Sequence, residues 1–265
     1  MEDEHLGFMD KMKQKFTQGK QLVLEKMGKA DQTPEDPEFR KTLDTFKATR
    51  LTYEDLCSRS KQYSAALGNA QQHGTALAET WLSFGASQQT ALGAALLKFG
   101  EVQKALEAER ESLVSTIGGK MLGPMQTLLD GEIKDCREVK NRHHRLRLEY
   151  DSARNELQGQ TSKKDRNAFK IQQAEAEFGK LKARFDSMQQ EVADRCRNVE
   201  ARKDFELLEQ VVEFMDAQFT YYQQCYSKIA EVEPYLRTLQ QEIRAAAASV
   251  PAEAPEAEAE ATATQ

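Results

Sequence analysis

Basic side chains are concentrated in one stretch of this sequence, residues 134–170. The stretch contains eleven Lys or Arg and six Asp or Glu, a net charge of +5, whereas the whole chain of 265 residues carries −6. Salt screens exposed charges over about 10 Å, so a local basic patch can attract an anionic surface even on an acidic protein. We predict lipid-headgroup binding here, with a solvated helix face as the alternative. The predicted ligands are Arg142, Arg145, Arg147, Lys163, Lys164 and Arg166.

A second group of residues with membrane chemistry lies in residues 6–29. Its apolar side chains are spaced 3, 4, 7 and 4 residues apart, which places them on one face of a helix. Six lysines and two acidic residues border this face, a composition typical of helices that bind membrane surfaces. Three glycines weaken the helix, so we expect it to form on lipid rather than in water, the alternative being a core-facing helix. The predicted membrane-inserting residues are Met9, Met12, Phe16, Val23 and Met27, and the predicted headgroup ligands are Lys11, Lys13 and Lys15.

No group of residues has the spacing of a catalytic, metal or cofactor site. His143 and His144 are adjacent, so on a helix they point about 100° apart and cannot form the i, i+4 pair of a zinc helix. The four cysteines are far apart and include no CxxC pair. No nucleophile, base and orienting residue can be grouped. We predict that the protein is not an enzyme and binds neither a metal nor a cofactor.

Composition restricts the partners and the compartment. The acidic net charge argues against nucleic acid as a partner. Sparse cysteines fit a reducing cytosol. The sequence contains neither an apolar run long enough to span a bilayer nor the pattern of a signal peptide. We therefore expect a cytoplasmic protein that associates with membranes peripherally.

Long helices must position the basic and amphipathic segments. Only six prolines interrupt the chain, and apolar residues such as Phe46 and Tyr53 recur every seven positions, which is typical of coiled-coil packing. Pro124 lies inside an apolar pattern that resumes at once, so it predicts a kink rather than a helix end. A shift of the heptad phase predicts a bend near residues 200–207. The predicted helices span about 35–84, 88–158 and 166–245.

The predicted helices divide the chain into three segments and imply a dimer. Residues 1–32 are the membrane-inserting helix and its linker, 33–245 the helical domain, and 246–265 a disordered acidic tail. One chain supplies three helices whose aromatic seams need partners, so we predict an all-α, elongated, kinked three-helix antiparallel coiled coil that forms a crescent-shaped homodimer. The predicted dimer core contains Phe214, Met215, Phe219, Tyr222 and Tyr226.

Five segments resemble the BAR domains that carry an N-terminal amphipathic helix, those of endophilins above all. The segment from Phe8 to Phe39 is similar to the endophilin amphipathic helix and its acidic link. LAETWLSFG resembles the end of their first helix, and LGPMQTL their proline bend. Two further segments, RLRLEYD and the stretch from Phe214 to Ile243, resemble the basic run of the second helix and the dimer-forming end of the third. The similarity is colinear over about residues 6–245.

The resemblance implies dimerisation, binding to anionic phospholipid membrane, and curvature sensing or generation in vesicle trafficking or endocytosis. The sequence departs from endophilins in two ways: no apolar insert lies between Tyr63 and Leu77, and no SH3 domain follows the third helix. Recruitment of proline-rich partners is therefore not expected. The alternative is a soluble helical scaffold that binds a small GTPase, as arfaptin-type modules do, or a cytoskeletal partner.

Overall fold

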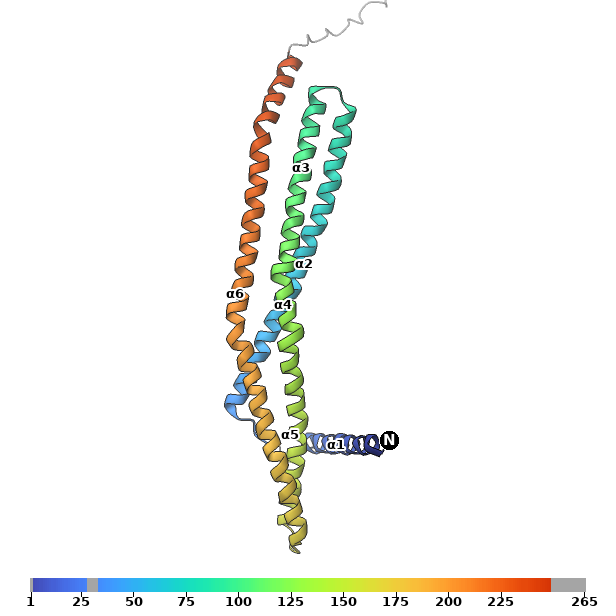
Figure 1. Cartoon of the computed structure of the whole chain (residues 1–265), viewed down its shortest axis with the longest axis vertical. Helices are drawn as coiled ribbons and strands as arrows, with labels where there is room; N and C mark the ends of the chain where they lie inside the picture. Colours follow the sequence, from blue (N-terminus) through green and yellow to red (C-terminus); the bar gives the residue numbers. More distant parts are fainter. Residues whose placement is uncertain (1, 28–32, 249–265) are drawn as a thin grey trace, which may run out of the picture. The chain divides into compact units, whose positions relative to one another are not determined.

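The computed structural model of the chain is almost entirely helical, and its described part covers residues 2–27 and 33–248, with side chains at residues 12, 14–27 and 33–248. This confirms the predicted all-α fold class. Within this part, no helix is both long and apolar enough to cross a membrane. The elements are α1 (Glu2–Lys26), α2 (Pro37–Ser87), α3 (Ala91–Thr116), η1 (Ile117–Leu122), α4 (Gly123–Leu128), η2 (Leu129–Ile133), α5 (Lys134–Thr161) and α6 (Ala168–Ala248) (Figure 1).

Short polar caps set the ends of the long helices. The Asp36 carboxylate accepts the Glu38 N–H at 3.3 Å, and Pro37 occupies the first helical position, where its missing N–H costs nothing. Asn167 caps α6 in the same way, since its side chain accepts the Lys170 N–H at 3.1 Å. The predicted tail overlaps α6 at residues 246–248, and its remainder, 249–265, lies outside the described residues.

The middle of the chain stays helical through Pro124. Two π-helical segments, η1 and η2, flank the short helix α4 that contains this proline. Proline lacks one backbone N–H and its ring crowds the preceding turn, and wider π-type turns occur where the regular hydrogen-bond pattern is interrupted. The helical stretch that begins at Ala91 therefore ends only at Thr161.

The described chain forms two compact units. Unit 1 comprises residues up to 60 and 121–211, and unit 2 comprises residues 61–120 and 212 onward. In unit 1, α2, the α4–α5 stretch and α6 enclose a continuous apolar core. Its most buried large side chains are Phe46, Tyr53, Met125, Ile133, Val139, Val192 and Val199.

Unit 2 is built differently, around a close helix pair and a buried ion pair. Among its described residues, the buried apolar side chains are Ala78, Leu113, Ile117 and Val232. Beside them, Glu107 is 1% exposed, pairs with Arg110 and accepts a hydrogen bond from Gln103 at 2.6 Å. Unit 2 therefore has a smaller apolar core and a polar centre.

Glycines allow α2 and α3 to lie side by side in unit 2 (Figure 1). A Cβ at Gly93 would lie 2.2 Å from the Gln88 carbonyl oxygen, and one at Gly100 would lie 2.7 Å from Leu82 Cγ. A Cβ at Gly74 would overlap the buried Glu107 carboxylate. Only glycine fits where backbone or a buried side chain approaches this closely.

Candidate membrane-binding surface

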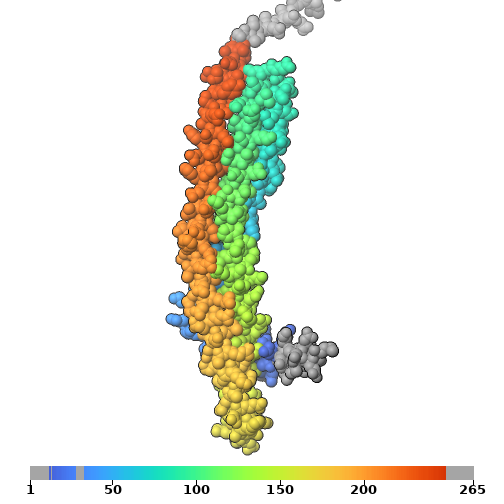
Figure 2. Space-filling model, in the orientation of Figure 1, coloured from blue at the N-terminus to red at the C-terminus, as the bar shows by residue number. Residues whose placement is uncertain are grey.

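Helix α1 lies against α5 (Figure 1, Figure 2), and polar side chains make hydrogen bonds between the two helices. Gln21 is 2% exposed and receives a hydrogen bond from Asn155 at 3.5 Å. Gln18 donates to the Glu149 carboxylate at 2.7 Å. Away from these contacts, the N-terminal end of α1 points away from α5 (Figure 1). These hydrogen bonds are contacts between α1 and α5 that the sequence analysis did not predict.

The predicted membrane-inserting side chains of α1 that the structure describes are largely exposed. Met12 and Val23 are each 55% exposed, Met27 is 58% exposed and Phe16 is 75% exposed. These are four of the five predicted membrane-inserting residues, and the side chain of the fifth, Met9, lies outside the described residues together with those of Lys11 and Lys13. A docked helix with an exposed apolar side is suited to shallow insertion among lipid headgroups.

A buried ion-pair network, the α1–α5 clamp, joins α1 and the following link to α5 through Glu25, Thr33, Arg147, Asp151 and Arg154. Arg147 lies 3.2 Å from Glu25 of α1 and 3.0 Å from Asp151 of its own helix. The Thr33 hydroxyl donates to Asp151 and accepts from Arg154 at 2.7 Å.

The clamp corrects the predicted role of Arg147. Its side chain is only 6% exposed and pairs with two carboxylates, so in this structure it faces the protein rather than an open surface. Burial raises the pKa of Asp151, while the hydrogen bond from Thr33 and the charges of Arg147 and Arg154 oppose that rise. A buried carboxylate needs such partners, because an unpaired charge away from water is strongly unfavourable.

A basic groove, the α1–α5–α6 groove, lies beside this clamp in unit 1. Its volume is about 550 Å3. Lys15 of α1 and Arg142 and Arg145 of α5 contribute charge to it, as predicted headgroup ligands, and Arg184 of α6 adds a fourth basic side chain that the sequence analysis missed. Arg184 lies outside the basic stretch 134–170, so only the packing of α6 reveals it. The remaining lining residues are Met12, Gln14, Gln18, Leu146, Glu149 and Met188.

The other three predicted headgroup ligands, Lys163, Lys164 and Arg166, lie in the turn between α5 and α6. All three are exposed, and Lys163 donates a hydrogen bond to Gln160 at 3.2 Å. The structure therefore divides the predicted headgroup set between the groove, the turn and the clamp.

His143 lies in the core of unit 1, where it is 5% exposed. Its ring stacks on Phe185 at 4.9 Å between centroids and meets the edge of Phe39 at 5.0 Å. Its Nε2 has no hydrogen-bond partner among the described residues. Burial, and then the positive charges of His144 and Arg147, lower the pKa of His143 to about 4.

The predicted dimer residues form part of an exposed stripe on α6 in unit 2. Phe219 is 68% exposed, Tyr222 63% and Tyr226 75%, whereas Phe214 is half-buried against Tyr63. The stripe, hereafter the α6 seam, has the 3, 4 spacing of a coiled-coil seam. It consists of Val212, Met215, Phe219, Tyr222, Tyr226 and Ile229.

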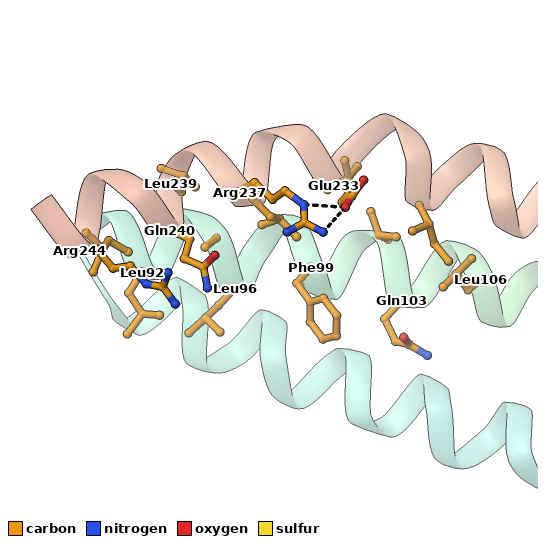
Figure 3. A pocket seen from close by; sticks show the side chains of 16 residues that line it. Leu92, Leu96, Phe99, Gln103, Leu106, Glu233, Arg237, Leu239, Gln240 and Arg244 are labelled. Atoms are coloured by element: carbon orange, nitrogen blue, oxygen red, sulfur yellow. Dashed lines mark hydrogen bonds and ion pairs between the residues drawn. The ribbon is translucent and has the colours of Figure 1, made fainter.

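An apolar groove between α3 and α6 continues this surface within unit 2 (Figure 3). Its volume is about 770 Å3, and it is lined by Leu92, Leu96, Phe99 and Leu106 of α3 and by Leu239 and other residues of α6. Arg237 and Glu233 pair with each other at its edge. The sequence analysis assigned no residue of this groove to the dimer core.

Comparisons with known proteins point to one family. A model of the BAR domain matches residues 12–238. The Rho GTPase-activating protein gacP of Dictyostelium discoideum is 25% identical over 232 residues, which are 85% of this chain and 40% of that protein. Endophilin-B1 of Homo sapiens is 23% identical over 237 residues, 82% of this chain and 63% of that protein. The chain thus spans less than two thirds of either relative.

A solved structure shares the fold. The Drosophila amphiphysin BAR domain is 15% identical and aligns with a TM-score of 0.67 over 78% of this chain and 94% of that one. At this identity the likeness concerns the helical architecture alone.

Proposed function

Because the chain belongs to the BAR domain family, we propose that it is a peripheral membrane protein of the cytoplasm that binds anionic bilayers and senses or generates curvature. Vesicle trafficking or endocytosis is the proposed setting. We propose no catalytic activity and no cofactor for it.

One observation carries this proposal: α1 is docked on unit 1 with its apolar side exposed, next to a groove lined by four basic side chains. Burying a large apolar side chain contributes roughly 1.5–3 kcal/mol, and nearby basic residues add electrostatic attraction to anionic lipid. Apolar insertion and headgroup attraction therefore act at one place on the molecule.

Cosedimentation with phosphatidylserine-containing vesicles tests the proposal. Phe16→Glu should weaken binding by at least about tenfold, because it places a charge where apolar contact with lipid is expected. Leu51→Glu is the matched control, since Leu51 is 48% exposed on α2, and it should bind as the unaltered chain does. If the unaltered chain stays in the supernatant, or Phe16→Glu binds equally well, the proposal is wrong.

The turn between α5 and α6 contributes a second, purely electrostatic contact in this proposal. Replacing Lys163, Lys164 and Arg166 together by Glu should weaken vesicle binding while helicity is unchanged, because the three side chains are exposed. Raised salt should have the same effect on the unaltered chain. Salt-insensitive binding by the triple variant would exclude the turn from the membrane contact.

We also propose a homodimer formed through the α6 seam and the apolar groove between α3 and α6. An exposed heptad seam beside an apolar groove of about 770 Å3 is a contiguous apolar surface, and such surfaces mark protein–protein contact sites. A second copy of the chain would cover this surface with the same surface of its own, because the two-fold axis of a homodimer brings identical patches together.

A second candidate function is binding of a small GTPase. It is favoured by the similarity to gacP, a protein named as a Rho GTPase-activating protein, although the matched region is 40% of that protein. Calorimetric titration of the chain with GTP-loaded Rho-type and ADP-ribosylation-factor-type GTPases would test this candidate. Heat of binding that persists in Phe16→Glu would favour a surface other than α1.

A further inference from the structure

We infer that Cys136 and Cys196 are a site of reversible oxidative modification, at which a peroxide links α5 covalently to α6 through a disulfide bond. The inference does not depend on the proposed membrane function, because both side chains lie in the core of unit 1 rather than on a surface. Buried cysteines can also serve only as small apolar side chains, and the geometry and surroundings of this pair distinguish it from that case.

The first argument is the distance between the two thiols. The Sγ atoms of Cys136 and Cys196 lie 3.3 Å apart, and the two side chains are 1% and 0% exposed. They come from two different helices and are 60 positions apart in the chain. The sulfurs of a disulfide are about 2.05 Å apart, so this pair has to close by only about 1.3 Å. Cys57 instead contacts the Gln126 side-chain oxygen at 3.4 Å.

The second argument is the reactivity of the Cys136 thiol. The hydrogen bond from the Cys196 thiol lowers the pKa of Cys136, and the positive charges of Arg195 and Lys140 lower it further, against the opposing effect of burial. The same hydrogen bond and burial raise the pKa of Cys196. The thiolate is the form that attacks oxidants. Cys136 is therefore the attacking thiol, and Cys196 is the thiol that resolves the product.

The third argument is a polar groove that lies beside the pair in unit 1. Its volume is about 320 Å3. Asp135 and Arg195, the residues immediately before the two cysteines, line it, and so does Val199, which is 2% exposed. The groove therefore reaches a core side chain one helical turn from Cys196. Hydrogen peroxide is little larger than water, so it can enter this groove and needs only local opening of the core to reach the sulfurs.

The reaction balances with a peroxide as the oxidant. The Cys136 thiolate attacks one oxygen of hydrogen peroxide and breaks the O–O bond, which gives a sulfenic acid and hydroxide. The Cys196 sulfur then attacks the Cys136 sulfur, the S–O bond breaks, and a second hydroxide leaves. The two thiol protons convert both hydroxides to water. Two thiols and one hydrogen peroxide thus give one disulfide and two water molecules, and a dithiol reductant reverses the change.

The cross-link would join α5 to α6 within the unit 1 core. It would close a loop around the turn between these helices, because Cys136 precedes the turn and Cys196 follows it. A disulfide stabilises mainly by restricting the unfolded chain, so the oxidised protein should unfold about 5–10 °C above the reduced one. Oxidation would also fix the register of α5 against α6. In a reducing compartment the link would be transient and would form when peroxide is present.

Mapping the disulfides of the full chain after treatment with hydrogen peroxide tests the inference. We expect a peptide pair joined through Cys136 and Cys196. It should form before Cys57 or Cys225 is modified, although Cys225 is the more exposed thiol. Dithiothreitol should remove both the link and the gain in unfolding temperature. Cys136→Ala should abolish that gain relative to its own reduced form, whereas the matched control Cys57→Ala, at another buried cysteine, should keep it.

The charge beside Cys136 gives a second test. Arg195→Gln should slow cross-linking about threefold, because a smaller fraction of Cys136 would be thiolate. Arg197→Gln is the matched control, since Arg197 is an exposed arginine of α6 that pairs with Asp194 outside the groove, and it should leave the rate unchanged. Equal rates in the two variants would overturn the assignment of Cys136 as the attacking thiol.

Two outcomes of the mapping would overturn the modification site itself. One is oxidation confined to Cys225, and the other is a link between Cys136 and Cys196 that forms only in denaturant. Neither outcome bears on vesicle binding, which is measured on the reduced chain, so the proposed membrane function stands or falls separately.

Discussion

Unit 1 and unit 2 bury their apolar side chains to different extents. In unit 1 three helices enclose residues such as Phe46, Ile133 and Val192, each at most 2% exposed. In unit 2 Phe219 and Tyr226 of the α6 seam are more than 60% exposed. Unit 1 thus completes its core within one chain, and unit 2 leaves apolar surface that a second chain can cover. In the proposed dimer, stability and assembly would therefore be encoded in separate lengths of the same helices.

The largest effect should follow from charging the α6 seam. The double variant Phe219→Glu, Tyr222→Glu should raise the dimer dissociation constant by at least about 100-fold, because two charges would be buried without partners in the interface. Sedimentation velocity at micromolar concentration measures this. Phe169→Glu is the control in unit 1, where Phe169 is 74% exposed, and it should leave the dimer unchanged. A monomer in the unaltered chain would refute the contrast between the units.

An effect of similar size should follow from truncating the unit 1 core. Ile133 is 1% exposed, so Ile133→Ala should lower the free energy of unfolding by about 3 kcal/mol, the cost of lost burial plus a cavity. Urea denaturation should show this loss at every protein concentration. Ile229→Ala, at a position 50% exposed in unit 2, should instead show a loss that depends on protein concentration. Identical concentration dependence in both variants would contradict the division of roles.

The smallest effect concerns the histidines of the two units. Because the pKa of His143 falls to about 4 in the folded chain, the unfolded chain binds more protons between pH 6.5 and 4. Stability is therefore lost as the pH falls through this window, by about 2 kcal/mol between pH 7 and pH 5. His143→Phe should reduce this loss. His73→Phe, at an exposed position of unit 2, should not. Equal pH dependence in all three proteins would show that His143 is accessible to protons without cost.

Heptad spacing predicted the helices and much of the unit 1 core, because burial in a coiled coil follows the period of the helix. Phe46 and Tyr53, expected to lie on one seam, are 2% and 1% exposed. The same spacing could not predict the close pairing of α2 and α3, because the contacts of Gly93 and Gly100 depend on how near another backbone comes.

The site was less predictable than the fold. Composition indicated α1 and the basic stretch as membrane-binding segments. Charge alone, however, does not distinguish a side chain that faces solvent from one that faces a carboxylate. Arg147 and Arg145 are two residues apart, yet Arg147 is buried between Glu25 and Asp151 whereas Arg145 lines the groove. Arg184 joins the groove from α6, beyond the basic stretch 134–170. These placements bring together residues that are far apart in the chain, such as Glu25 and Arg147 in the clamp and Lys15 and Arg184 in the groove.

The α1–α5 clamp has a mechanical consequence. Glu25 and Arg147 connect the two helices directly, and Thr33 fixes the chain that follows α1 to Asp151. A load applied to α1 is therefore carried into α5 at two anchor points rather than through the peptide link alone. A displacement of α1 would therefore be transmitted to the α5 backbone. If α1 inserts into a bilayer, as proposed, α1 and α5 would move together.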